Sequence, residues 1–174
     1  FSGILITTGI IAKLTEEELE AIVAHEASHV KNRDPLLLYI LSSIEYLSRV
    51  TVALALWRFF LFFPLLELLY VYISLTTLFF VAKFIEARAD IEAALISGKP
   101  LKLANALRKI GLIRLIRETK NSSRLFYWLS WDTHPPLSFR IETLEEIGVN
   151  GPPKNIWRFA ITRCLKDFSL SITS

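Results

Sequence analysis

Apolar and polar residues change their spacing along this chain, and each spacing predicts a different element. Residues 1–9 combine β-branched and apolar residues and end in glycine, a pattern typical of a short strand and a turn. Thr15 and Glu18 then have the spacing of a capping box, with apolar residues at helical intervals behind them. We expect a helix from about Glu16 to about Lys31, closed by Asp34-Pro35 because a residue before proline avoids the helical region.

The most apolar part of the chain is residues 36–82, where 47 residues carry only four charges: Glu45, Arg49, Arg58 and Glu67. As a helix this segment would be roughly 70 Å long, against a hydrocarbon core of about 30 Å. The pattern therefore predicts a two-pass membrane hairpin bent near Pro64. Its longest uncharged run, 15 residues, is short for a transmembrane helix. Long helices buried in a core or a subunit interface are the alternative.

Positive charges flank this apolar segment at both ends. They are Lys31 and Arg33 before it, and Lys83 and Arg88 after it. By the positive-inside rule, both ends of the hairpin should face the cytoplasm. The expected location is thus the cell membrane, with the lipid bilayer as a partner.

Helical spacing returns after the apolar segment. We expect one helix from about Val81 to Ser97 and another from about Leu101 to Lys120, with one apolar face made by Leu103, Leu107, Ile110 and Ile113. Residues 99–124 hold eight Lys or Arg and one Glu, which suits either a solvated polar face or contact with anionic headgroups. Residues 151–174 have the pattern of a final helix or tail.

Length and composition limit the class of protein. The 174 residues have the length of one domain, and a hydrophobic share of 52% with a mean hydropathy of +0.42 excludes disorder. One cysteine excludes an internal disulfide framework. The absence of methionine leads us to expect a piece of a longer protein. No basic groove interleaved with aromatic residues is evident, so we expect no nucleic-acid partner.

The clearest chemical signal is His25-Glu26-Ala27-Ser28-His29 on the first expected helix. A spacing of four residues puts both imidazoles on one helix face, where they can bind one zinc ion, and Glu26 lies close enough to take a proton from water at the metal. Two unrelated surface histidines would be the structural alternative.

A hydrolytic zinc site needs three protein ligands and an open position. Glu86 and Asp90 have the spacing of four residues on a later helix, so Glu86 can reach the metal while Asp90 orients a ligating histidine. Taken alone, this pair is typical of a salt-bridged surface, and Glu92 is the closest competitor for the ligand.

The last histidine, His134, precedes two prolines in a loop that leads to Arg140. The prolines fix an extended backbone that can aim the imidazole into a cleft. We expect His134 to donate a hydrogen bond to the oxyanion formed during carbonyl attack, and Arg140 to bind substrate or brace the site. A packed loop histidine is the structural alternative.

Together these motifs resemble the HtpX-like membrane zinc metallopeptidases, gluzincins related to the CAAX prenyl endopeptidases. The resemblance covers roughly residues 1–145 and includes the Thr-Thr-Gly segment, the His25-Glu26-x-x-His29 helix, Glu86-x-x-x-Asp90 and the Thr-His-Pro-Pro loop. It implies zinc held by His25, His29 and Glu86, Glu26 as general base, Asp90 in support, and His134 with Arg140 as transition-state or substrate contacts. It also implies that residues 36–82 are the membrane hairpin inserted between the metal-binding helices.

We therefore expect one metallopeptidase domain over residues 1–174, mainly α-helical (α+β) and zincin-like, with a small amino-terminal sheet and an inserted hydrophobic hairpin. The expected function is peptide-bond hydrolysis with one Zn²⁺ per chain. By resemblance only, its polypeptide substrates would be misfolded membrane proteins. A CAAX-type endopeptidase and a non-catalytic zinc-binding membrane scaffold are the alternatives.

Overall fold

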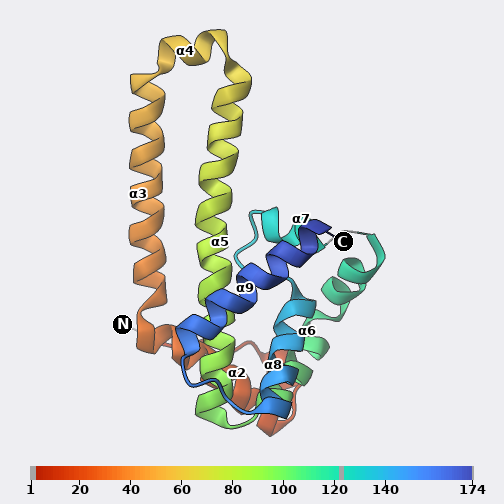
Figure 1. Ribbon diagram of the computed structural model, residues 1–174. Helices are drawn as coiled ribbons and strands as arrows, with labels where there is room; N and C mark the ends of the chain where they lie inside the picture. The colour runs from red at the N-terminus through yellow and green to blue at the C-terminus, as the bar shows by residue number, and fades with distance from the viewer. Residues whose placement is uncertain (1–2, 122–123, 174) are drawn as a thin grey trace.

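The computed structural model describes residues 3–121 and 124–173, and these residues form helices and connecting loops (Figure 1). In chain order the helices are α1 (Thr8–Ile11), α2 (Glu16–Asn32), α3 (Asp34–Ala55), α4 (Trp57–Phe62), α5 (Pro64–Ser97), α6 (Pro100–Asn121), α7 (Arg124–Leu129), α8 (Leu137–Asn150) and α9 (Ile156–Thr173). The expectation of a mostly helical protein is confirmed.

The small amino-terminal sheet was a wrong prediction, because the described residues contain no strand. Gly3 to Thr7 have no regular structure, and Gly9, the expected turn, lies inside α1. A strand needs a neighbouring strand to take up its backbone hydrogen bonds. The described part of the chain offers none, so the β-branched residues here remain largely exposed.

Helix α2 begins at the predicted capping box and ends one residue after the predicted Lys31, but Pro35 does not exclude Asp34 from a helix: Asp34 begins α3, and the break lies at Arg33. The Thr15 hydroxyl accepts from the backbone amide of Glu18, and the Glu18 carboxylate accepts from that of Thr15, completing the capping box. The helix ends at Asn32, and Arg33 alone, in the left-handed conformation, joins it to α3. This one-residue junction brings Asp34, the first residue of α3, back toward the last turn of α2.

Helices α3 and α5 form the expected hairpin, with α4 across its tip and Pro64 at the start of the returning helix (Figure 1). Both α3 and α5 are long and apolar enough to cross a membrane, and almost none of their apolar windows is buried by the rest of the chain. The separate helix expected from about Val81 is instead the lower half of α5. No helix-breaking residue interrupts the sequence between Pro64 and Ser97, so one helix continues through both.

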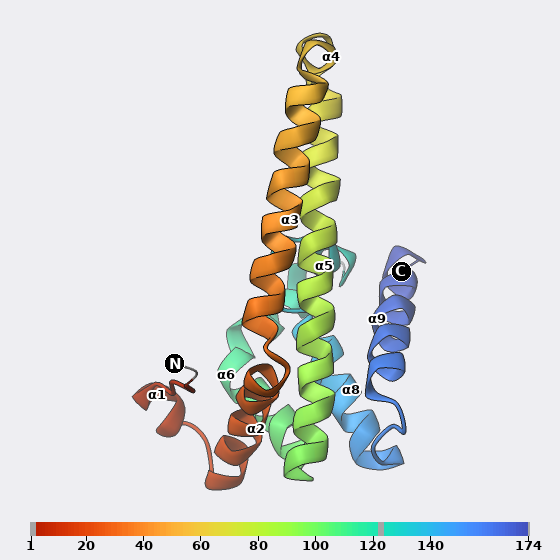
Figure 2. The same cartoon turned by 90° about the vertical axis from the view of Figure 1, so that its left-hand side faces the viewer.

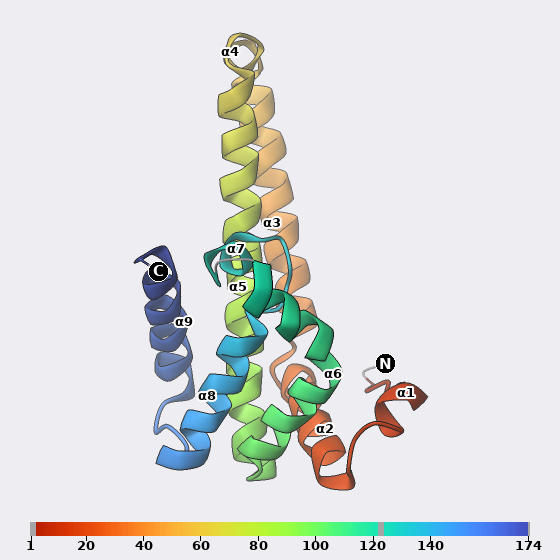
Figure 3. The same ribbon diagram turned by 90° about the vertical axis from the view of Figure 1, so that its right-hand side faces the viewer.

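The lower half of α5 is the centre of the helical body. Helices α2, α6, α8 and α9 pack around it, as Figures 2 and 3 show from two sides. Its buried residues include Ile91, which joins a core with Leu103, Leu107 and Leu144. A second core surrounds Trp128, whose indole donates to Asp167 on α9 at 2.7 Å.

The apolar face predicted for helix α6 is buried only over its first half. Leu103 and Leu107 lie in the core, whereas Ile110 and Ile113 are exposed. In the second half, other residues meet α8: Leu137 packs against Gly111, and the Glu118 carboxylate accepts from the backbone amides of Leu137 and Ser138. The expected final helix is confirmed as α9.

Candidate metal centre

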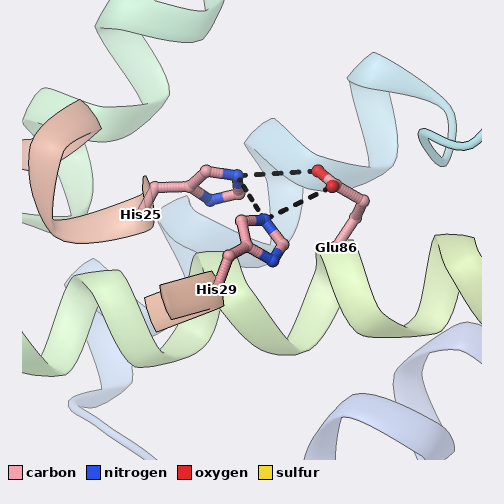
Figure 4. A group of neighbouring side chains, drawn as sticks. All are labelled: His25, His29 and Glu86. Atoms are coloured by element: carbon pink, nitrogen blue, oxygen red, sulfur yellow. Dashed lines mark hydrogen bonds and ion pairs between the residues drawn. The ribbon is translucent and has the colours of Figure 1, made fainter. Parts of the chain in front are cut away.

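Two helices bring three predicted ligands to one point. His25 and His29 lie one turn apart on α2, and Glu86 faces them from α5 (Figure 4). The two Nε2 atoms are 3.2 Å apart, and the Glu86 carboxylate oxygens lie 3.5 Å from His25 Nε2 and 3.3 Å from His29 Nε2. Two ring nitrogens and one carboxylate thus converge within 4.8 Å of one another.

Asp90 holds His25 from behind. His25 Nδ1 lies 3.0 Å from Asp90 Oδ1, an electrostatic contact without the alignment of a hydrogen bond. Burial lowers the pKa of His25, but the carboxylates of Asp90 and Glu86 outweigh it and raise the pKa to about 9. A metal must displace this proton, so metal binding at the site would be coupled to proton release.

Asp34 holds His29 in the same way, a role that the sequence analysis missed. His29 Nδ1 lies 2.7 Å from Asp34 Oδ2, and the buried guanidinium of Arg88 bonds to the same oxygen. Burial lowers the pKa of His29, but the carboxylates of Glu86 and Asp34 outweigh this effect, so the pKa is raised above its usual value. The signal for this contact in the sequence is that Asp34 follows His29 by five residues, just beyond the end of α2.

Arg140 on α8 completes the support of His25. Its guanidinium is almost fully buried and donates two hydrogen bonds of 2.7 Å to the Asp90 carboxylate. Its Nη1 also lies 3.9 Å from Glu86 Oε2. Of the two roles expected for Arg140, this position favours bracing the site over binding substrate.

Glu92, the competing ligand, faces a different part of α2. Its carboxylate accepts hydrogen bonds from Ser28 at 2.9 Å, Asn32 at 2.6 Å and Lys31 at 2.5 Å. These bonds fasten α2 to α5 beside the centre. Cys164 is buried in the core around Trp128 and does not belong to the group of convergent ligands.

Two further predicted residues are Glu26, which is adjacent to a ligand in the sequence, and His134, which lies beside Glu86. Glu26 follows His25 on α2 and its side chain is exposed. His134 Nε2 lies 3.7 Å from Glu86 Oε2, and 46% of the side chain is exposed. The ring Nδ1 contacts Thr133 Oγ1 at 3.1 Å and Asp132 Oδ1 at 3.3 Å, so neighbouring loop residues orient the imidazole.

The residues present fit a divalent zinc ion. Glu86 Oε2 is buried and accepts no hydrogen bond within the described residues, although two imidazoles and a guanidinium surround it. Two imidazole nitrogens and one carboxylate form a donor set that zinc accepts in hydrolytic sites, where one position stays open. Carboxylates behind both imidazoles are the usual support of such ligands.

Fold and site together define a helical protein in which residues that could hold a metal ion lie near the base of an apolar hairpin. Residues 2–148 match the family model of Peptidase family M48, and the chain belongs to this family. It is 31% identical to Protease HtpX homolog 2 of Methanosarcina acetivorans, over 83% of this chain and 58% of that protein. It is 30% identical to the Protease HtpX homologs of Pyrococcus furiosus (84% and 60%) and Gemmatimonas aurantiaca (84% and 61%).

The resemblance to HtpX-like peptidases is therefore confirmed. The chain spans about three fifths of the length of these relatives. No solved structure gives a significant match.

Proposed function

We propose that this chain carries the active site of a zinc-dependent membrane endopeptidase. The observation that carries the proposal is the convergence of His25, His29 and Glu86, with Glu26 of the His-Glu-x-x-His helix next to the first ligand. A purely structural zinc site would have no use for a base beside an open position, which disfavours the scaffold. The relatives named above are HtpX homologs and do not favour a CAAX-type enzyme.

Each residue of the site has its own role in the proposed hydrolysis. A zinc ion held by His25, His29 and Glu86 would polarise the scissile carbonyl and lower the pKa of the attacking water. Glu26 accepts the proton of that water and passes it to the leaving amine. His134 donates a hydrogen bond to the oxyanion that forms as the carbonyl is attacked. Asp90, Asp34 and Arg140 keep the ligands in position.

Metal content tests the ligand set directly. We expect one zinc per chain in the purified protein, and Glu86→Gln should lose most of it because the charged third ligand is gone. Glu92→Gln is the matched control, since Glu92 lies on the same helix and also contacts α2. Elemental analysis of the three proteins gives the answer. Zinc retained by Glu86→Gln and lost from Glu92→Gln would overturn the assignment.

Kinetics test the role of His134. If His134 bonds only to the developing oxyanion, His134→Ala should lower kcat by about 10²–10³-fold with little change in KM. Zinc content and melting temperature should match the parent, because the side chain is half exposed and contacts mainly its own loop. A packing role predicts the reverse: an early melting transition with full specific activity in the folded fraction.

We also propose that residues 36–82 cross the cell membrane as a hairpin with both ends, and hence the active site, on the cytoplasmic side. Support comes from the apolar lengths of α3 and α5 and from the basic residues at the hairpin's base. The substrates we propose are polypeptides, misfolded membrane proteins among them.

Labelling of single cysteines tests this topology in cells that express the whole protein. A membrane-impermeant maleimide should reach Phe63→Cys at the hairpin tip from outside, and Glu20→Cys on α2 only after permeabilisation. The native thiol should stay silent, because burial raises the pKa of Cys164 to about 12. Equal labelling of both positions in intact cells would contradict the topology.

A further inference from the structure

The helical body around the lower half of α5 has an apolar face at the level where α3 and α5 extend away from it. We call this face the shoulder; it consists of the second half of α6, α7 with Trp131, and the second half of α9. In Figures 1 and 3 these segments end beside the middle of α5, while α3 and α5 continue beyond them. Its exposed apolar side chains include Leu112, Ile113 (70% exposed), Phe126 (62% exposed), Trp131, Leu170 and Ile172. Exposed apolar patches of this kind mark interaction surfaces.

The level of the shoulder along α5 is set by direct contacts. The Trp131 indole donates to Thr76 Oγ1 at 3.2 Å, and the ring of Phe80 packs on Trp128 with centroids 5.5 Å apart. Twelve residues separate Pro64 from Thr76, which is about 18 Å of helix. This length is well short of the hydrocarbon thickness of about 30 Å.

The tip of the hairpin carries residue types that are found where a membrane protein meets the boundary between lipid and water. Arg58 lies over the ring of Trp57 at 5.4 Å on α4, and Trp and Arg are typical of the boundary between lipid and water. If α4 lies at the membrane surface far from the helical body, about twenty residues of α5 cross the hydrocarbon core. The boundary of the core nearer the body then lies at about Phe84. The level of Thr76 and Trp131 then falls inside the near leaflet.

We propose that the shoulder is immersed in the near leaflet, so that α7 and the second halves of α6 and α9 contact lipid. This rests on the proposed insertion of the hairpin. Glu86 is 22 residues from Pro64, or about 33 Å along the helix, just outside a hydrocarbon core of about 30 Å. The metal centre therefore lies at the membrane surface, and its substrates are polypeptide segments that emerge from the bilayer or lie on it.

Two further features suit the shoulder to lipid. An apolar groove of about 530 Å³ between α5 and α7 is lined by Tyr72, Leu125, Phe126, Leu129, Ser130 and Trp131, and it has the character of a site for an acyl chain. Two of the cations beside it are paired: Arg114 with Asp132 at 3.1 Å, and Arg124 with Glu142 at 2.8 Å. Pairing lowers the cost of bringing these two charges close to the hydrocarbon.

Depth measurement on nitroxide-labelled cysteines tests the proposal. The intact protein is placed in vesicles of phosphatidylcholine and phosphatidylglycerol with one label at Phe126→Cys or Ile113→Cys on the shoulder. The matched control is Glu20→Cys at the opposite end of the body, and Leu47→Cys, exposed near the middle of α3, reports the insertion of the hairpin. Cys164 is buried, so the parent chain should take up no label. Collision rates with oxygen and with a water-soluble nickel chelate give the depth of each label.

We expect the shoulder labels to collide with oxygen at least several-fold more, relative to the nickel chelate, than the Glu20→Cys control does. Shoulder labels that collide with nickel as often as the control would overturn the proposal, while a label at Leu47→Cys that is still protected from nickel would leave the hairpin inserted. A Leu47→Cys label open to nickel would overturn both ideas. Shoulder labels shielded from oxygen and nickel alike, with spin–spin broadening, would identify a second copy of the chain as the occupant and overturn the lipid contact.

Discussion

Glu26→Gln should abolish proteolysis and leave the zinc in place. The amide keeps the size of the side chain but cannot accept the proton of the attacking water, so kcat/KM should fall by about 10²–10⁴-fold. The side chain is exposed and is not part of the convergent ligand group, so metal content and melting temperature should stay near those of the parent. A fluorogenic peptide assay and elemental analysis on one preparation measure both quantities.

Glu20→Gln is the matched control for this prediction. Glu20 lies on the same helix, is exposed, and pairs with Lys99 at 2.6 Å away from the centre. This variant should keep the parental rate. Near-parental turnover of Glu26→Gln would exclude Glu26 as the base, and loss of zinc together with activity would make it a ligand instead.

Asp34→Ala should weaken both zinc binding and the fold. The Asp34 carboxylate is buried, contacts His29 Nδ1 at 2.7 Å and pairs with the buried Arg88. Without it, His29 loses the group that orients its ring, and zinc affinity should drop about 10–100-fold. Arg88 loses a buried carboxylate partner and keeps its bond to Glu92 at 3.2 Å and its contact with the Trp157 ring, so the free energy of unfolding should fall by about 3 kcal/mol.

A second buried carboxylate separates these two effects. Asp167 accepts from Trp128 and pairs with Arg124 in the core of α7 and α9, away from the metal centre. Asp167→Asn should lower the melting temperature but leave zinc affinity unchanged. Asp34→Asn retains an acceptor for His29, so its zinc affinity should lie between that of Asp34→Ala and that of the parent. Competition with a chelating dye below the melting transition measures the affinity. Normal affinity in Asp34→Ala would contradict the positioning role.

The ligand helices could be predicted because their signals are local. The capping box at Thr15 and Glu18 identifies the start of α2, and the four-residue spacing of His25 and His29 puts both rings on one face whatever surrounds the helix. The low charge of residues 36–82 and Pro64 likewise predict the hairpin and its bend. These properties depend on neighbours within a few residues, so tertiary contacts did not change them.

The errors concern elements whose form depends on distant partners. Residues 1–9 have strand-like composition, but a strand exists only with a partner strand, and the described chain supplies none. Ile110 and Ile113 continue the apolar spacing of α6, yet they are exposed because α8 meets Gly111 and Glu118 instead. Periodicity identifies a face but not what covers it.

The sequence by itself therefore determined helix α2, the apolar hairpin and the pair of histidines, since each follows from spacing within one segment. Only the tertiary structure distinguishes the positions of Glu86 and Glu92: both lie on α5, and the packing of α2 against that helix turns Glu86 toward the imidazoles and Glu92 toward Ser28 and Asn32. It alone also assigned Asp34 to His29, because that contact depends on the one-residue turn at Arg33 and on Arg88 from 54 residues away. Contacts between segments distant in sequence depend on the packing of whole helices, which no local pattern encodes.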